Sequence, residues 1–129
     1  MYEDLPAAIT EFFDAINNRN VWAAEAFLTE DVSYQLLVPH PKIVGRTAVL
    51  DALSASITEA DRVSWEVVTF AVGPDLALVE RIDRFWFDGN EAAIDCTGVF
   101  ELRGGRIAAV RDYADLDTWR RRKQAALES

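Results

Sequence analysis

The sequence predicts an α+β fold in which helices pack on one side of a curved β-sheet. Three observations support this prediction. Apolar residues recur at helical spacing in the first half of the chain, the period changes to two after about residue 60, and short turns rich in Gly, Pro, Asp and Asn separate the later segments. The chain has 129 residues, of which 50% are apolar, and this is enough to close one core. We therefore expect a single domain over residues 1–129.

Apolar stripes at helical spacing predict three helices before the change of period. The first runs from about Leu5 to Asn18, a short second from about Val21 to Leu28, and the third from about Thr47 to Thr58. Residues Asp31 to Val38 lie between the second and third helices, and their alternating polar and apolar side chains predict a short strand. A last helix is expected to begin near Asp115 to Asp117.

Alternating segments in the second half predict a succession of four strands. They run from about Arg62 to Val72, Leu76 to Phe87, Ala92 to Leu102 and Ile107 to Tyr113. The connections contain Gly-Pro-Asp, Asp-Gly-Asn and Gly-Gly, which reverse the chain, so consecutive strands should pair as antiparallel neighbours. A strongly bent sheet packed against helices can form a cone whose open end admits a small molecule, and we expect a ligand cavity there.

The composition excludes several classes of function. A formal net charge of -9 argues against nucleic acid and anionic membranes as partners, because both bind clusters of Lys and Arg. No apolar run approaches the about 20 residues of a membrane span, and the first residues, Met1 to Asp4, lack the positive charge of a signal peptide. We therefore expect a cytoplasmic protein. With a single cysteine, Cys96, and a single histidine, no intrachain disulfide can form and no metal site is expected.

One predicted strand carries charged side chains among large apolar ones. Successive residues of a strand point to opposite sides, so one face of this strand carries Val79, Arg81, Asp83, Phe85 and Phe87. Burying a guanidinium and a carboxylate costs free energy unless they pair, and such a pair in an apolar wall is a common arrangement for acid or base chemistry. A second acid, Asp112, ends a similar run, on the same side as Val110. The pattern predicts a pocket that contains two carboxylates and one arginine.

Several motifs resemble those of the limonene-1,2-epoxide hydrolases, within the NTF2-like and SnoaL-like superfamily. They are Glu80-Arg81-Ile82-Asp83-Arg84-Phe85, Gly98-Val99-Phe100-Glu101-Leu102 with the following Gly104-Gly105-Arg106-Ile107, Arg111-Asp112-Tyr113-Ala114-Asp115, and Trp119. The resemblance covers most of the chain. It implies an NTF2-like cone, in which a strongly curved mixed β-sheet carries three N-terminal helices on its concave side.

The resemblance also implies roles for four residues. In that family an Asp-Arg-Asp triad opens an epoxide in one step, without a covalent enzyme intermediate and without a cofactor. By position, Asp112 would take a proton from water, Asp83 would donate one to the epoxide oxygen, and Arg81 would lie between them. Tyr34 matches the tyrosine that helps the base to position the water. Ring opening of this kind needs a base on one side and an acid on the other.

Two positions depart from the family pattern. The asparagine that the family carries two residues after the tyrosine, where it also binds water, is Leu36 here, and a tryptophan expected just before Asp112-Tyr113 is Val110. Leucine can neither donate nor accept a hydrogen bond, so the attacking water would lose one positioning contact. We expect these two residues to line the substrate pocket, together with Val79, Phe85 and Phe87.

The residues leave three other interpretations open. Arg81 and Asp83 are two residues apart on one strand and could form a purely structural ion pair. An isomerase or cyclase that uses one aspartate as a proton shuttle needs no ordered water, which fits Leu36 better than hydrolysis does. A non-catalytic carrier would use the cone only to bind an apolar ligand.

The expected partners are an apolar small-molecule substrate and a second copy of the chain. We expect a homodimer through the convex face of the sheet, partly from the resemblance. A face that exposes Trp65 or Trp86 would also favour association, because large apolar surfaces on a monomer usually find a partner.

Overall fold

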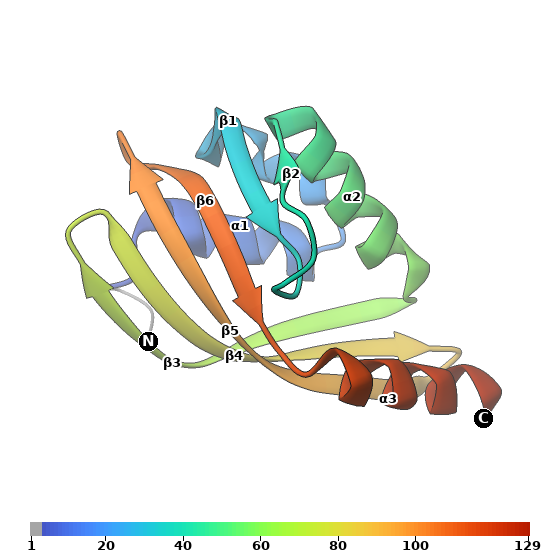
Figure 1. The fold of residues 1–129 in the computed structure, drawn as a ribbon. Coiled ribbons are helices and arrows are strands. Elements are labelled where there is room, and N and C mark those ends of the chain that lie inside the picture. The colour runs from blue at the N-terminus through green and yellow to red at the C-terminus, as the bar shows by residue number, and fades with distance from the viewer. Residues whose placement is uncertain (1–3) are drawn as a thin grey trace.

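Six strands form one curved sheet in the order β2-β1-β6-β5-β4-β3 (Figure 1). The structure is a computed structural model that describes residues 4–129. The expectation that no signal peptide begins the chain falls partly on residues 1–3, which lie outside the described residues. The strands are β1 (Leu28–Gln35), β2 (Ile43–Val44), β3 (Arg62–Gly73), β4 (Leu76–Phe87), β5 (Asn90–Arg103) and β6 (Arg106–Tyr113).

The sheet is mixed, because β1 pairs with β6 in parallel and every other neighbouring pair is antiparallel. The short turns after β3, β4 and β5 join antiparallel neighbours, as the sequence predicts. The bounds of β3 to β6 agree with the predicted ones to within two residues. The α+β prediction is confirmed.

Three helical segments precede the long strands, and they cover the concave side of the sheet. They are α1 (Ala7–Asn17), the 3₁₀ helix η1 (Val21–Phe27) and α2 (Arg46–Glu59). Figure 1 shows α1 in the hollow of the sheet, with α2 beside β2. The apolar stripe of α1 includes Phe12 and Phe13, whose rings meet Phe100 of β5 edge to face and close the core at this end.

The last helix, α3 (Leu116–Glu128), packs against β5 and β4. Its first turn is capped by the side chain of Asp115, which accepts hydrogen bonds from the backbone of the first turn. Trp119 contacts the ring of Phe85 at a centroid distance of 4.9 Å, and Lys123 forms an ion pair with Glu59 of α2. The helix therefore lies against the sheet, and one ion pair links it to α2. No helix between residues 4 and 129 is long and apolar enough to cross a bilayer.

Two predicted elements differ from those observed. The first strand was expected over Asp31 to Val38, but β1 begins earlier and ends earlier. It begins at Leu28, which already pairs with Ile107, and it ends before Leu37, where the chain turns with a φ of 60°. The second predicted helix forms, but as a 3₁₀ helix that ends before β1. The strand β2 was missed, since two residues are too few to display alternation.

Candidate active site

Four polar side chains from three strands meet on the concave face of the sheet. Tyr34 lies on β1, Asp112 on β6, and Arg81 and Asp83 on β4. Strand β5 lies between β4 and β6, so the guanidinium must cross it to reach Asp112. It crosses at Gly98, which stands opposite Asp112 in the register and has no side chain in the way. A Cβ atom at this glycine would lie 2.7 Å from Arg81 Nη1 and 2.9 Å from Asp112 Oδ1.

The guanidinium of Arg81 bridges the two carboxylates. Its Nε and Nη2 donate to the two oxygens of Asp83 at 2.7 and 3.2 Å, and Nη2 also lies 2.9 Å from Asp112 Oδ2. The hydroxyl of Tyr34 donates to the same Asp112 oxygen at 2.7 Å. Within residues 4–129, Arg81 Nη1 and Asp112 Oδ1 have no hydrogen-bond partner. One donor and one acceptor of the cluster are therefore unsatisfied among these residues.

The cluster is almost fully removed from solvent, with exposed fractions of 1% for Arg81, 5% for Asp83 and 3% for Asp112. Burial raises the pKa of Asp83 to about 6, against the opposing effect of Arg81. Burial also acts against the charge of Arg81, but the adjacent carboxylates of Asp112 and Asp83 outweigh it and hold the pKa of that guanidinium well above its usual value. The cluster thus pairs a permanently charged arginine with a carboxyl that titrates near neutrality.

Two aromatic rings pack against the guanidinium of Arg81. Arg81 Cζ lies 4.6 Å from the ring centroid of Trp65 and 5.6 Å from that of Phe13. Burial and the charge of Asp112 raise the pKa of Tyr34 well above its usual value, so its hydroxyl stays protonated and acts as a donor. The geometry of the cluster is therefore fixed by packing as well as by hydrogen bonds.

A cavity of about 130 Å³ opens beside the two carboxylates. Its wall is mainly apolar and includes three aromatic rings. The lining residues are Leu36, Leu37, Ser56, Trp65, Asp83, Phe85, Ile94, Cys96, Asp112, Ala114 and Trp119. Among residues 4–129, no group of three or more His, Cys, Asp or Glu side chains could hold a metal ion. The arrangement offers an acid, a base and an apolar wall to a ligand of about the size of one ring.

Residues 9–110 match the family model of the SnoaL-like domain. The chain belongs to this family. Among solved structures similar to this SnoaL-like chain, an LEH-like epoxide hydrolase from M. tuberculosis is 26% identical, with a TM-score of 0.76 over 95% of this chain and 91% of that chain.

Two further solved structures share the SnoaL-like fold. A putative polyketide cyclase from Xanthomonas campestris is 21% identical, with a TM-score of 0.75 over 87% of this chain and 90% of that chain. A hypothetical protein with a ketosteroid isomerase-like fold from Catenulispora acidiphila is 17% identical, with a TM-score of 0.79 over 88% of this chain and 89% of that chain. At these identities the likeness shows the fold alone. The fold therefore occurs in proteins named as hydrolases and as cyclases, and it does not by itself select one activity.

The SnoaL-like fold brings Tyr34, Arg81, Asp83 and Asp112 together, and it places Leu36 and Phe85 in the cavity wall. The three other pocket residues expected from the sequence lie elsewhere, and these are Val79, Phe87 and Val110. The two valines are fully buried in the core with α1. The ring of Phe87 stacks on that of Phe85 and is covered by the ammonium group of Lys123. Alternation selects the correct face for all three, but the helices fill most of the hollow and leave a cavity at one end.

Several cavity residues were not anticipated. Trp65 was considered for the exposed convex face, but it is buried on the concave face as the direct cross-strand partner of Asp83. Cys96, noted from the sequence only as the single cysteine, stands opposite Arg81 and lines the cavity, where burial raises the pKa of its thiol. Pairing outward from the short turn between β3 and β4 would align Glu66 with Asp83, and only the register shift between Val67 and Thr69 brings Trp65 opposite Asp83.

Proposed function

We propose that this SnoaL-like protein is a hydrolase that opens a small apolar epoxide by a one-step attack of water. Water would add to one carbon of the ring and lose a proton to Asp112, while the C–O bond breaks and its oxygen takes a proton from Asp83. The product is a vicinal diol. The proton on Asp112 must then return to Asp83, and Arg81, which touches both, holds the two carboxyls in place for this exchange.

The observation that carries the proposal is the unequal use of the two oxygens of Asp112. Oδ2 accepts a hydrogen bond from Tyr34 and forms an ion pair with Arg81, while Oδ1 has no hydrogen-bond partner within residues 4–129. Because its partners gather on one oxygen, the other oxygen keeps its capacity to accept a proton from water. This is the state that a general base requires.

The environment of Asp83 supports the role of acid. Its pKa, raised to about 6 by burial, keeps a fraction of the carboxyl protonated near neutral pH, where an ordinary aspartate would have almost none. Two carboxyls in one site with different surroundings are a usual way to divide acid and base roles. The M. tuberculosis relative named as an LEH-like epoxide hydrolase, at 26% identity, also supports this activity.

An isomerase or cyclase is the second candidate, and the position of Leu36 favours it. This residue lies in the cavity wall, where an apolar side chain cannot hold a water molecule. In that reaction one aspartate would move a proton between two atoms of the substrate, and no water would be consumed. A carrier that binds an apolar ligand without turnover is the third candidate.

Incubation with terpene and styrene-type epoxides in ¹⁸O-labelled water separates the three. Hydrolysis gives vicinal diols that contain one labelled oxygen, whereas an isomerase or cyclase gives a rearranged product without the label. A carrier gives neither, although the ligand still binds. Recovery of unlabelled rearranged product alone would contradict the hydrolase proposal.

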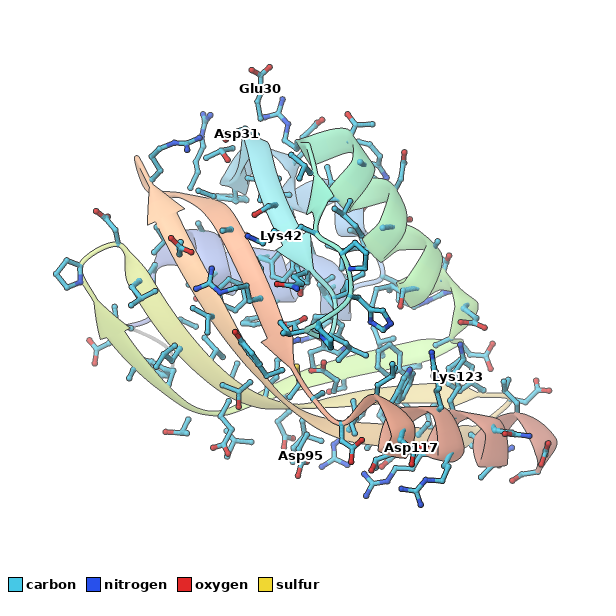
Figure 2. All side chains as sticks on the ribbon, in the orientation of Figure 1. Glu30, Asp31, Lys42, Asp95, Asp117 and Lys123 are labelled. Atoms are coloured by element: carbon cyan, nitrogen blue, oxygen red, sulfur yellow. The ribbon has the colours of Figure 1, made fainter. Side chains whose placement is uncertain are left out.

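The matched pair of variants for this assay is Asp112→Asn and Asp95→Asn. We expect Asp112→Asn to lower kcat by about 10²-fold to 10⁴-fold, because it removes the base. Asp95 is exposed on β5 and projects from the sheet away from the N-terminal helices (Figure 2), so the same change there should leave the rate within about twofold. Equal losses in the two variants would contradict the role of Asp112.

A further inference from the structure

The indole N–H of Trp65 is a buried donor without a partner. Within residues 4–129, its Nε1 atom makes no hydrogen bond, although the residue is only 6% exposed. A buried donor left without an acceptor costs roughly 1–3 kcal/mol, and each such group in a folded protein calls for an explanation. Trp65 also lines the cavity beside the two carboxylates. A ligand in that cavity is the natural source of the missing acceptor.

Packing around the ring and hydrogen bonds to the backbone hold Trp65 in place. One face of the ring packs on the guanidinium of Arg81, and Phe85 meets the ring at a centroid distance of 6.2 Å and an angle of 70°. The side chain of Asn17 binds both backbone groups of Trp65 on the outer edge of β3, at 2.7 and 3.2 Å. The ring is therefore preorganised, and its donor is fixed before any ligand arrives.

Trp65 and Asp83 are direct cross-strand partners in β3 and β4, so their side chains leave the sheet next to each other on one face. We propose that the Trp65 indole N–H binds the same ligand oxygen that Asp83 protonates. The role of Asp83 in this statement rests on the proposed function. During ring opening the indole hydrogen stays on nitrogen and stabilises the negative charge that develops on oxygen, while the transferred proton comes from Asp83.

The proposal defines the class of ligand. The cavity volume of about 130 Å³ is close to that of cavities that bind one benzene ring, and Phe85 and Trp119 supply an aromatic wall. The ligand is therefore a compact molecule with one apolar ring and one oxygen acceptor on a short side arm. Small aryl-substituted epoxides belong to this class, and so do the corresponding alcohols.

Benzyl alcohol and ethylbenzene provide an inert test, because they have nearly the same shape and differ only in a hydroxyl group in place of a methyl group. The chain has four tryptophans, so the indole ¹H–¹⁵N spectrum contains four resonances, and Trp22→Phe, Trp86→Phe and Trp119→Phe assign that of Trp65 by elimination. We expect benzyl alcohol at saturation to move the resonance of the Trp65 indole proton to lower field. Ethylbenzene, which has no oxygen acceptor, should not cause this shift. This measurement does not require the Trp65 variant to fold.

Affinities measured on Trp65→Phe give a second readout, with Trp119→Phe as the matched control in the same cavity wall. Phenylalanine keeps an aromatic ring and removes the donor. We expect the preference for benzyl alcohol over ethylbenzene, taken as the ratio of the two Kd values, to fall about fivefold or more in Trp65→Phe. The ratio should change by less than about twofold in Trp119→Phe, even if that variant binds both ligands more weakly.

The proposal is overturned if the Trp65 resonance gains no low-field shift at saturating benzyl alcohol, if a folded Trp65→Phe keeps the wild-type ratio, or if benzyl alcohol at millimolar concentration does not enter the cavity. None of these readouts depends on turnover. A low-field shift without any diol in the labelled-water assay would retain Trp65 as an oxygen-binding donor and reject hydrolysis. Diol formation without the low-field shift would retain hydrolysis and reject the role of Trp65.

Discussion

Gly98 lies directly beneath the guanidinium of Arg81, close enough that a single added methyl group would come within 2.7 Å of Nη1. The end of an arginine side chain usually moves aside at little cost. Here it is fixed by Asp83 and Asp112, so any movement breaks the bridge between them. We expect Gly98→Ala to lower the free energy of unfolding by about 1–3 kcal/mol, as measured by urea denaturation, and to reduce kcat at least about tenfold.

Gly73→Ala is the control for this change. Gly73 also lies in a strand, but nothing stands within 4 Å of its added Cβ. We expect this variant to match the wild type in stability to within about 0.5 kcal/mol. A Gly98→Ala variant that behaves in the same way would show that the contact between Arg81 and Asp112 tolerates displacement.

We expect the rate of epoxide hydrolysis to fall as the pH rises, because Asp83 acts as the acid. Its folded-state pKa is raised to about 6, and the proposed reaction needs the protonated form. Above that pH the protonated fraction falls about tenfold per unit, so kcat/KM should decline in the same way between pH 6.5 and 8.5. Asp83→Asn should be slower by about 10²-fold or more at low pH and should lose this decline. A flat wild-type profile over the range would exclude Asp83 as the acid.

We expect the substitution Leu36→Asn to raise the rate of epoxide hydrolysis. Leu36 stands in the cavity wall where the limonene-1,2-epoxide hydrolase pattern has a water-binding asparagine. An amide at this position would supply one more hydrogen bond to the attacking water, and we expect the rate of diol formation to rise about fivefold or more. The control is Leu37→Asn, which adds an amide one residue away at a backbone position with a φ of 60° that asparagine tolerates. An equal gain in both variants would contradict a specific water site at residue 36.

Association through the convex face of the sheet stays a prediction, and Leu78 is the residue that tests it. Leu78 is exposed on β4 between two buried neighbours, so it points to the convex side, as does the exposed Tyr113 on β6. We expect a dimer in small-angle scattering and a monomer for Leu78→Glu. Val44→Glu, at the far edge of the sheet on β2, should leave the mass unchanged. A wild-type monomer would refute the prediction.

Local patterns predicted the fold well because strand and helix periods are properties of neighbouring residues. Alternation alone placed Arg81, Asp83 and Phe85 on one face, and the turns fixed which strands are neighbours. Alternation does not say how far along a curved face a cavity extends. Val79 shares that face, but the part of the hollow near it is filled by α1, and it belongs to the core.

The contacts between strands were harder to predict. The meeting of Arg81 with Asp112 depends on a gap in the intervening strand at Gly98, and no period marks that gap. The burial of Trp65 beside Asp83 depends on the register of β3 and β4, which also contains a shift between Val67 and Thr69. These features follow from the pairing of strands, which short-range patterns do not specify.

Helix α3 contributes Trp119 to the cavity, yet it lies wholly outside the segment 9–110 that matches the SnoaL-like domain. The portion of the molecule that surrounds a ligand is thus partly separate from the portion that builds the scaffold. Changes along this C-terminal helix can retune selectivity while the sheet and its cluster of Arg81, Asp83 and Asp112 stay intact. In this way the C-terminal helix can vary to suit different ligands while the fold stays the same.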